Sequence, residues 1–193
     1  MNRERLGQKL RTRRDLLAAA RALIDRGAEI NVAAVADEAG ISRATAYRYF
    51  SDSATLALEA VLDGAVVAPQ NVIPERASTR ERVHAVRRYW LSFYSIWENR
   101  LRVFAARALQ SGSDGAPRYR RAARRLPMFR EALAPVGTRL GEKKLEELTL
   151  AVSAVSGFEN YITLKDILGQ DQARIEALSA TILDALLDKY GVA

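Results

Sequence analysis

The sequence predicts an all-α protein with two helical domains, and two observations lead to that prediction. Apolar residues recur at the three- and four-residue spacing of amphipathic helices, and no segment sustains the apolar-polar alternation typical of a strand. The clearest break is the segment APQNVIPERAS, with prolines at positions 69 and 74. We therefore expect an N-terminal domain over 1–68, with a three-helix unit followed by a fourth helix, and a larger helical domain over 69–193. A hydrophobic content of 49% is enough to bury a core.

Capping residues and glycines delimit the helices of the N-terminal domain. Thr12 and Asp15 form a capping-box pattern that opens the first helix, which ends at Gly27. Gly40 is expected at the turn after the second helix. The side chains suited to capping the N-termini of the next three helices are Asn31, Ser42 and the run Ser51-Asp52-Ser53. The expected helices, in order, are 12–27, 32–39, 43–50 and 53–67.

The C-terminal domain is expected to contain longer helices. The segment SGSDGAP is a loop by composition, Pro127 interrupts the arginine-rich helix that follows it, and Gly169 separates the last two helices. The expected helices, in order, are 79–97, 101–110, an arginine-rich stretch from 118, 128–140, 142–168 and 171–190.

The chain contains no cysteine and one histidine, His84. Disulfides, thiolate metal sites, cysteine nucleophiles and multi-histidine metal sites are therefore excluded, and we expect neither a metal nor another cofactor. The basic N-terminus lacks the apolar segment and cleavage site of a signal peptide, and no uncharged run approaches the roughly 20 apolar residues that span a bilayer. We expect a soluble, cytoplasmic protein that does not contact a membrane.

Positive charge is concentrated in two segments. The net charge is +7 and the sequence pI about 10.0, which favours a polyanionic partner. Residues 1–14 hold six basic side chains and one acid, and residues 118–130 hold six arginines and no acid. The rest of the chain is therefore close to neutral or slightly acidic. We interpret 118–130 as a solvated face, with attraction of an anionic ligand or an acidic surface as the alternative.

The segment 43–50 has the composition of a helix that contacts nucleic acid. At 100° per residue, Ala46 and Phe50 define an apolar direction, whereas Arg48 and Ala44 point away from it. A guanidinium, a methyl group and the Thr45 hydroxyl can read base edges in a major groove, and tyrosine hydroxyls on the flanks suit phosphates.

The residues before this helix complete a helix-turn-helix pattern over 31–50. Small Ala36 lies where the two helices would cross, Gly40 lies at the turn, and Asn31 caps the first helix. In such a motif the second helix enters the groove and the first crosses the DNA backbone. The spacing alone leaves open a second interpretation, a helical hairpin with tyrosines and arginines on a solvated face.

Residues 11–62 also resemble the N-terminal domain of the tetracycline-repressor (TetR) family of bacterial transcription regulators. The matching positions are Ala19, Ala20, Gly27, Val35, Ala36, Ala39, Gly40, Ile41, Ser42, Thr45, Tyr47, Tyr49, Phe50 and Leu56. Departures from the pattern are Ser53, where the family usually has lysine, and the small Ala46. The segments RRLPMFREALAP and VSGFENYITLKDILG look like that family's ligand-binding and dimerisation domain.

The resemblance implies roles for individual residues. The side chains implied to contact phosphates are Asn31, Ser42, Tyr47 and Tyr49. The side chains implied to face bases are Arg43, Ala44, Thr45 and Arg48. The N-terminal arginines that can replace the charge of the missing lysine are Arg11, Arg13 and Arg14, because phosphate binding tolerates several geometries.

The last two helices are more apolar than a small monomer should expose. We expect 142–168 and 171–190 to pair with their copies in a four-helix homodimer interface, as the resemblance also implies. The apolar positions on them are Leu145, Leu148, Val152, Val155, Ile162, Ile175, Leu178, Ile182, Leu186 and Leu187. The alternative is that both are core helices of a monomer.

Aromatic side chains in the middle of the chain are candidates to line a pocket for a largely apolar effector. The candidate lining residues are Trp90, Phe93, Tyr94, Trp97, Phe104, Met128 and Phe129. Arg107 and Glu159 are charges within apolar helices, so each needs a partner; they pair with each other or hold a polar group of the ligand. The alternative is that the aromatic residues form an ordinary core.

Together these features predict a ligand-responsive homodimeric repressor that binds a palindromic DNA operator and is released by a small molecule. One alternative is a non-specific architectural DNA-binding protein, which the basic segments permit. Another is a small enzyme that uses Glu159 in the aromatic pocket. The sequence offers no second placed carboxylate, nucleophile-base pair or phosphate-binding glycine loop, so we expect no enzymatic activity.

Overall fold

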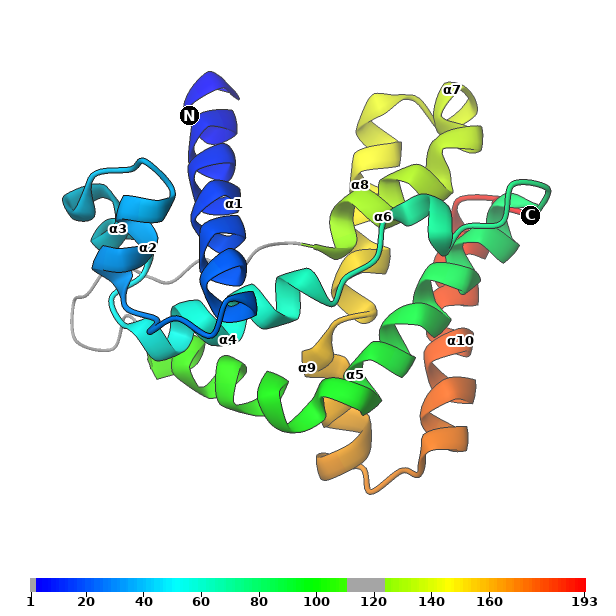
Figure 1. Ribbon diagram of the computed structural model, residues 1–193. Helices are drawn as coiled ribbons and strands as arrows, with labels where there is room; N and C mark the ends of the chain where they lie inside the picture. The colour runs from blue at the N-terminus through cyan, green and yellow to red at the C-terminus, as the bar shows by residue number, and fades with distance from the viewer. Residues whose placement is uncertain (1–2, 111–123) are drawn as a thin grey trace. The chain divides into compact units, whose positions relative to one another are not determined.

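The computed structural model describes the backbone of residues 3–110 and 124–193, and the side chains of 8–106, 109 and 124–193. Within these ranges every regular element is a helix (Figure 1), which confirms the predicted all-α fold. None of the helices in these ranges is both long and apolar enough to cross a membrane. The predicted loop at 111–117 and the arginines at 118, 120 and 121 lie outside the described residues.

The chain divides into two compact units. The first comprises Met1–Val66 with Arg102–Arg121, and the second comprises Val67–Leu101 with Ala122–Ala193. The helix α5 (Thr79–Gln110) contributes residues to both units. The sequence-based domain ranges, 1–68 and 69–193, therefore stay a prediction.

The first unit begins with four helices. These are α1 (Arg3–Asp25), α2 (Val32–Glu38), α3 (Arg43–Tyr49) and α4 (Ser53–Gly64). The predicted start of the first helix at Thr12 is wrong. The residues before it are mostly arginine, glutamate, leucine, glutamine and lysine, which favour helix, and they include no proline. Gly27 ends α1 with a φ of 66°, in the left-handed region that favours glycine.

The predicted capping residues cap the next three helices. Asn31 Oδ1 accepts a hydrogen bond from the Ala34 amide at 2.8 Å, and Asp52 Oδ1 accepts one from the Thr55 amide at 2.7 Å. Ser42 Oγ caps α3 in the same way. Each bond satisfies an amide that has no partner within its own helix. The starts of α2, α3 and α4 are therefore fixed by local sequence.

Small side chains let the helices of the first unit approach closely. Ala20 of α1, Ala36 of α2 and Ala46 of α3 are fully buried. Around them pack larger apolar side chains, which also have almost no exposed surface. They are Leu16, Leu17, Val35, Phe50 and Leu56. The core thus holds α3 by its Ala46 edge and leaves the opposite edge outside.

The second unit contains one long helix and several shorter ones. They are η1 (Pro69–Asn71), most of α5, α6 (Arg125–Leu133), η2 (Ala134–Val136), α7 (Gly137–Leu140), α8 (Glu142–Val155), α9 (Phe158–Ile162), η3 (Thr163–Ile167) and α10 (Gln172–Lys189). The predicted division between 79–97 and 101–110 is wrong, because Glu98-Asn99-Arg100 contains neither glycine nor proline and the helix continues through it.

Two more predicted boundaries are corrected. Pro127 lies in the first turn of α6, where its missing N–H has no helical partner to lose, so the helix is not interrupted there. Instead α6 ends before Pro135. The predicted helix 142–168 is broken at Gly157, whose backbone is extended (φ −80°, ψ 160°). The chain resumes as α9 and the π-helical turn η3.

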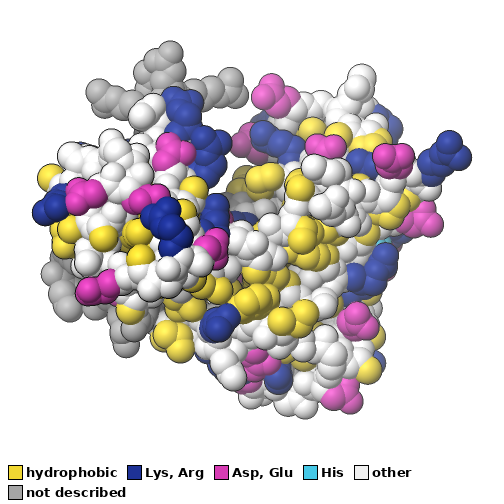
Figure 2. All heavy atoms as spheres, viewed as in Figure 1, with side chains coloured by type: hydrophobic (Ala, Val, Ile, Leu, Met, Phe, Trp, Pro, Cys, Tyr) yellow, Lys and Arg dark blue, Asp and Glu magenta, His cyan; other side chains and the backbone are white. Residues whose placement is uncertain are grey.

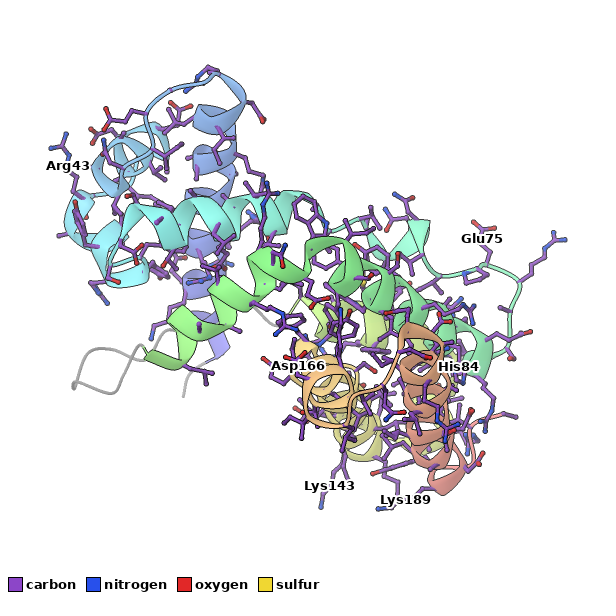
Figure 3. The ribbon with its side chains drawn as sticks, turned by 90° about the horizontal axis from the view of Figure 1, so that it is seen from below. Arg43, Glu75, His84, Lys143, Asp166 and Lys189 are labelled. Atoms are coloured by element: carbon purple, nitrogen blue, oxygen red, sulfur yellow. The ribbon has the colours of Figure 1, made fainter. Side chains whose placement is uncertain are left out.

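Polar side chains join α5 to α10. His84 Nε2 lies 2.9 Å from Asp184 Oδ1, and Arg80 Nη1 lies 2.5 Å from the same oxygen. Arg87 is buried and donates to Ser179 Oγ at 3.0 Å and to His84 Nδ1 at 3.3 Å. Since Nδ1 accepts a hydrogen bond, His84 carries its proton on Nε2 and donates it to Asp184. Figure 3 labels His84 on this helix pair.

Candidate nucleic-acid interface

The helix α3 presents its predicted contact residues outward. Ala44, Tyr47 and Arg48 are exposed, and Thr45 is partly exposed, while Ala46 has no exposed surface. Tyr49 is partly buried against the core of the first unit. The helix therefore offers one short row of side chains, held from behind by Ala46 and Phe50.

Two predicted phosphate contacts also serve as helix caps. Asn31 uses its carboxamide oxygen as the cap of α2, which leaves the donors of its amide nitrogen for another acceptor. Ser42 Oγ accepts from the Thr45 amide at 3.3 Å and donates to Thr45 Oγ1 at 2.9 Å. These bonds fix the rotamers of side chains that stand beside the exposed row of α3.

Arg43 forms an ion pair that sequence analysis did not predict. Its Nε donates to Asp37 Oδ1 at 3.2 Å and its Nη2 donates to Asp37 Oδ2 at 2.7 Å. The hydrogen bond from Arg43 is the largest cause that lowers the pKa of the Asp37 carboxyl. Figure 3 shows Arg43 at the outer edge of the first unit. Arg48, by contrast, makes no ion pair within the part of the chain that the structure describes.

The three predicted N-terminal arginines have different surroundings. Arg11 and Arg14 are exposed, whereas Arg13 Nη2 lies 2.5 Å from Oε2 of Glu59, which has no exposed surface. The Arg13 guanidinium also lies over the ring of Phe50, 4.7 Å from its centre. Arg13 thus joins α1 to α4 inside the domain and does not offer a free cation. The sequence did contain a signal for this pair. Glu59 lies next to Ala60 on the apolar side of α4, where a carboxylate needs a cationic partner.

The predicted pocket aromatics gather in the second unit. The ring centres of Trp90 and Phe93 lie 5.2 Å apart, and Tyr94 lies 5.6 Å from Phe158 and 5.9 Å from Tyr161. Trp90, Phe93 and Tyr94 are almost fully buried. So are Met128 and Phe129. The Trp90 Nε1–H is buried without a hydrogen-bond partner among the described residues.

A polar group that sequence analysis missed lies beside these rings. The Tyr94 hydroxyl donates to the carbonyl oxygen of Ser156 at 2.9 Å and accepts from Arg125 Nη1 at 3.1 Å. Arg125 Nε also donates to the Ser153 carbonyl oxygen at 3.2 Å. Arg125 was predicted only as a member of the arginine-rich segment 118–130, interpreted as a solvated face or, alternatively, as a segment that attracts an anionic ligand or an acidic surface. Its position two residues before Pro127, at the start of an apolar helix, was the available signal.

The remaining predicted pocket residues are placed differently. Trp97 is partly exposed, and its ring lies tilted beside that of Phe93, with ring centres 6.2 Å apart. Phe104 is buried, but it belongs to the first unit. The Arg107 side chain lies outside the described residues. Glu159 is exposed rather than enclosed in an apolar helix, because the break at Gly157 places it in the first turn of α9.

The predicted interface helices use much of their apolar surface internally. Leu148, Val152 and Ile175 are buried within the second unit, where α8 packs against α10. The large apolar side chains of this pair that stay partly or largely exposed are Leu145, Leu150, Val155, Leu178, Ile182 and Leu186. A narrower apolar surface is therefore available than the sequence pattern predicted.

Charge is mixed over the surface. On the face shown in Figure 2, Lys and Arg side chains are interspersed with Asp and Glu side chains. Within the first unit, Arg26 pairs with Glu38 at 2.8 Å and Arg21 pairs with Asp63 at 2.6 Å. Individual arginines, rather than a continuous basic surface in this view, are the features that can contact phosphates.

The comparison with protein families agrees with this geometry. The sequence model described as "Bacterial regulatory proteins, tetR family" matches residues 16–60, the segment from α1 through most of α4. Comparisons with curated proteins and with solved structures gave no match. The matched segment contains the helix-turn-helix of α2 and α3 and the exposed row of α3. The match therefore shows that residues 16–60 are similar to the tetR family of bacterial regulatory proteins, and it supports a DNA-binding role for this segment.

Proposed function

We propose that the protein is a repressor that binds a palindromic operator as a homodimer and is released by a small molecule. The observation that most supports this proposal is the orientation of α3, with Ala46 buried and Ala44, Arg48 and Tyr47 exposed. The row fits a major groove, which admits a single α-helix. Two such helices would enter successive grooves about 34–36 Å apart.

Roles on the DNA follow from side-chain chemistry. The side chains assigned to base edges are Arg43, Ala44, Thr45 and Arg48. The side chains assigned to phosphates are Asn31, Ser42, Tyr47, Tyr49, Arg11 and Arg14. Arg13 is left out, because its guanidinium is held by Glu59 inside the domain. Phosphate contacts set the register of the protein and base contacts supply sequence preference.

Dimerisation through α8 and α10 is supported by their partly exposed apolar residues. Leu178, Ile182 and Leu186 lie at four-residue spacing on α10, with the small exposed Ala177 and Ala185 beside them. Small residues let a second helix approach closely. The copies of α8 and α10 would then form a four-helix interface, which is a closed, two-fold arrangement.

The effector site is proposed among the aromatic rings of the second unit. A buried donor without a partner costs about 1–3 kcal/mol, and native proteins supply a partner for nearly all such groups. Among the described residues, the Trp90 Nε1–H is such a donor. A largely apolar effector with a hydrogen-bond acceptor, such as a carbonyl or ether oxygen, would satisfy it.

Release from DNA would follow from a difference in effector affinity between two dimer conformations. An effector shifts the equilibrium only by the amount by which it prefers one conformation. A preference of about 1–3 kcal/mol changes DNA affinity about 5- to 150-fold. The Arg125 contacts to α5 and α8 lie beside the aromatic rings, so a bound effector there can change how these helices pack.

The experiment that tests this function is selection of the preferred duplex from a random DNA pool by the purified protein at fixed, near-physiological salt. Enrichment of a near-palindrome with two half-sites one helical turn apart supports a sequence-specific dimer. Salt-sensitive binding without enrichment contradicts it and favours an architectural DNA-binding protein, because phosphate contacts alone carry no sequence preference.

A further inference from the structure

Asp37 and Arg43 connect α2 to α3 on the exposed side of the helix-turn-helix. Asp37 accepts from Nε and Nη2 of Arg43, so its carboxylate occupies one edge of the guanidinium plane. A guanidinium has five N–H donors in a fixed planar arrangement. The edge formed by Nη1 and the second hydrogen of Nη2 therefore remains available. Within the described residues, Nη1 of Arg43 donates no hydrogen bond.

This pair contributes little to the stability of the domain. The side chain of Arg43 is 64% exposed and that of Asp37 is 58% exposed, and exposed ion pairs of this kind are weak. Both charges also stand at the unfavourable ends of their helices. Asp37 is in the last turn of α2, where the helix dipole is negative, and Arg43 is the first residue of α3, where it is positive. Helix stability does not account for either residue.

The pair does restrict the direction of the arginine. A free arginine has many rotamers, whereas two hydrogen bonds to one carboxylate fix both the position and the plane of the guanidinium. The remaining edge presents two parallel donors. Guanine offers two acceptors, N7 and O6, at the matching spacing in the major groove, and no other base does so.

We propose that Asp37 is a positioning residue that orients Arg43 to read a guanine in the operator. This inference rests on the proposed function, since it requires α3 to lie in the major groove. Asp37 also discourages the use of Arg43 as a phosphate contact, because a phosphate that displaces the carboxylate leaves an unpaired anion beside the DNA backbone. Arg48 has no such partner among the described residues and remains free to contact either a base or a phosphate.

The chain offers a matched control for the charge of Asp37. Its neighbour Glu38 is also on α2, and it pairs with Arg26 at 2.8 Å rather than with Arg43. Asp37→Asn and Glu38→Gln each remove one negative charge from the same helix, but only the first weakens the hold on Arg43. A difference between the two variants therefore reports orientation and not net charge.

The experiment measures binding of the full-length dimer to its selected duplex and to duplexes with each base pair of one half-site replaced. The wild type is compared with Arg43→Ala, Asp37→Asn, Asp37→Ser and Glu38→Gln at one salt concentration. Arg43→Ala is expected to lose preference for guanine at one position by about tenfold or more. The two Asp37 variants are expected to lose about three- to tenfold at that same position, and Glu38→Gln less than about twofold.

The outcomes separate this inference from the proposed function. If the wild type selects a palindrome but Arg43→Ala changes preference at no base pair, or at a pair without guanine, the inference fails while the repressor proposal stands. It also fails if Glu38→Gln and the Asp37 variants have equal effects. If the wild type selects no sequence, both proposals fail. Circular dichroism of each variant confirms that the changes compared are between folded proteins.

Discussion

The two units of the molecule handle polar groups in opposite ways. In the first unit the described core consists mainly of alanine, leucine and valine, and most charged side chains lie on the surface. In the second unit the buried groups include both aromatic rings and several polar groups, among them Arg87, Ser153, Ser179 and the Trp90 Nε1–H. The first unit thus presents its chemistry outward, as a protein that reads a long partner must. The second unit buries some of its polar groups, and the proposed effector site lies among them.

Glu59 is the exception in the first unit and gives the largest expected effect. Its carboxylate has no exposed surface and is bound by Arg13. Glu59→Ala should leave the guanidinium buried without its anion and lower the free energy of unfolding by about 3–5 kcal/mol. Urea denaturation of the full-length protein measures this. Glu38→Gln, which alters an exposed pair, is the control and should change stability by less than about 1 kcal/mol.

A substitution at Arg48 tests whether the exposed side chains of α3 contact DNA bases. Arg48→Ala should cost about 1–3 kcal/mol of discrimination at particular base pairs of the selected operator and leave the unfolding free energy nearly unchanged. Fluorescence anisotropy with single-substitution duplexes measures the discrimination. An equal loss of affinity for every duplex would assign Arg48 to phosphate contact and contradict base reading by this residue.

A substitution at Ile182 tests whether the exposed apolar side chains of α10 form a dimer interface. Ile182→Glu places a charge among the partly exposed Leu178 and Leu186 of α10. It should weaken dimerisation by about 2 kcal/mol, because a carboxylate buried in an apolar interface lacks a partner. Sedimentation velocity over a range of concentrations measures the dissociation constant. Thr181→Glu adds the same charge at a neighbouring exposed position and serves as the matched control. A dimer unaffected by Ile182→Glu would place the interface elsewhere.

The smallest expected effect concerns pH and the contacts between α5 and α10. Burial raises the pKa of the Asp184 carboxyl, but hydrogen bonds from His84 and Arg80 outweigh it, so the net pKa is lowered. The contribution of these contacts to stability is then present above the unfolded-state pKa of about 3.9 and is lost as pH falls further.

Because Asp184 is partly exposed, Asp184→Asn should lower stability at pH 7 by no more than about 1 kcal/mol. The difference from wild type should shrink as the pH falls below about 4. Thermal denaturation at several pH values measures it, and Asp171→Asn, which keeps its capping geometry, controls for the loss of one α10 carboxylate. A difference that grows with acidity would contradict the assigned direction.

Local signals made the helix-turn-helix predictable. Asn31, Gly40 and Ser42 act within three or four residues of their own positions, so periodicity and capping rules were enough to place α2 and α3. The outward direction of Arg48 followed from the buried Ala46 on the same short helix. The family resemblance and the family match then agree on this segment.

Long-range pairing explains what the sequence did not predict. Arg13 and Glu59 are far apart in the sequence, and a basic N-terminus alone does not tell which arginine is buried. The Asp37–Arg43 pair depends on the turn between two helices, and Arg125 reaches Tyr94 only because α6 packs beside α5 and α8. The break at Gly157 was missed because the apolar pattern continues across it.

The Asp37–Arg43 pair also has a consequence for how such an operator preference can change over evolutionary time. If this surface faces DNA as proposed, replacing Arg43 alone leaves an unpartnered carboxylate on it, and replacing Asp37 alone leaves a loosely held arginine. Either single substitution therefore gives a regulator that discriminates less well between operator sequences. Substitutions at positions 37 and 43 are therefore expected to be correlated among relatives that recognise different operators.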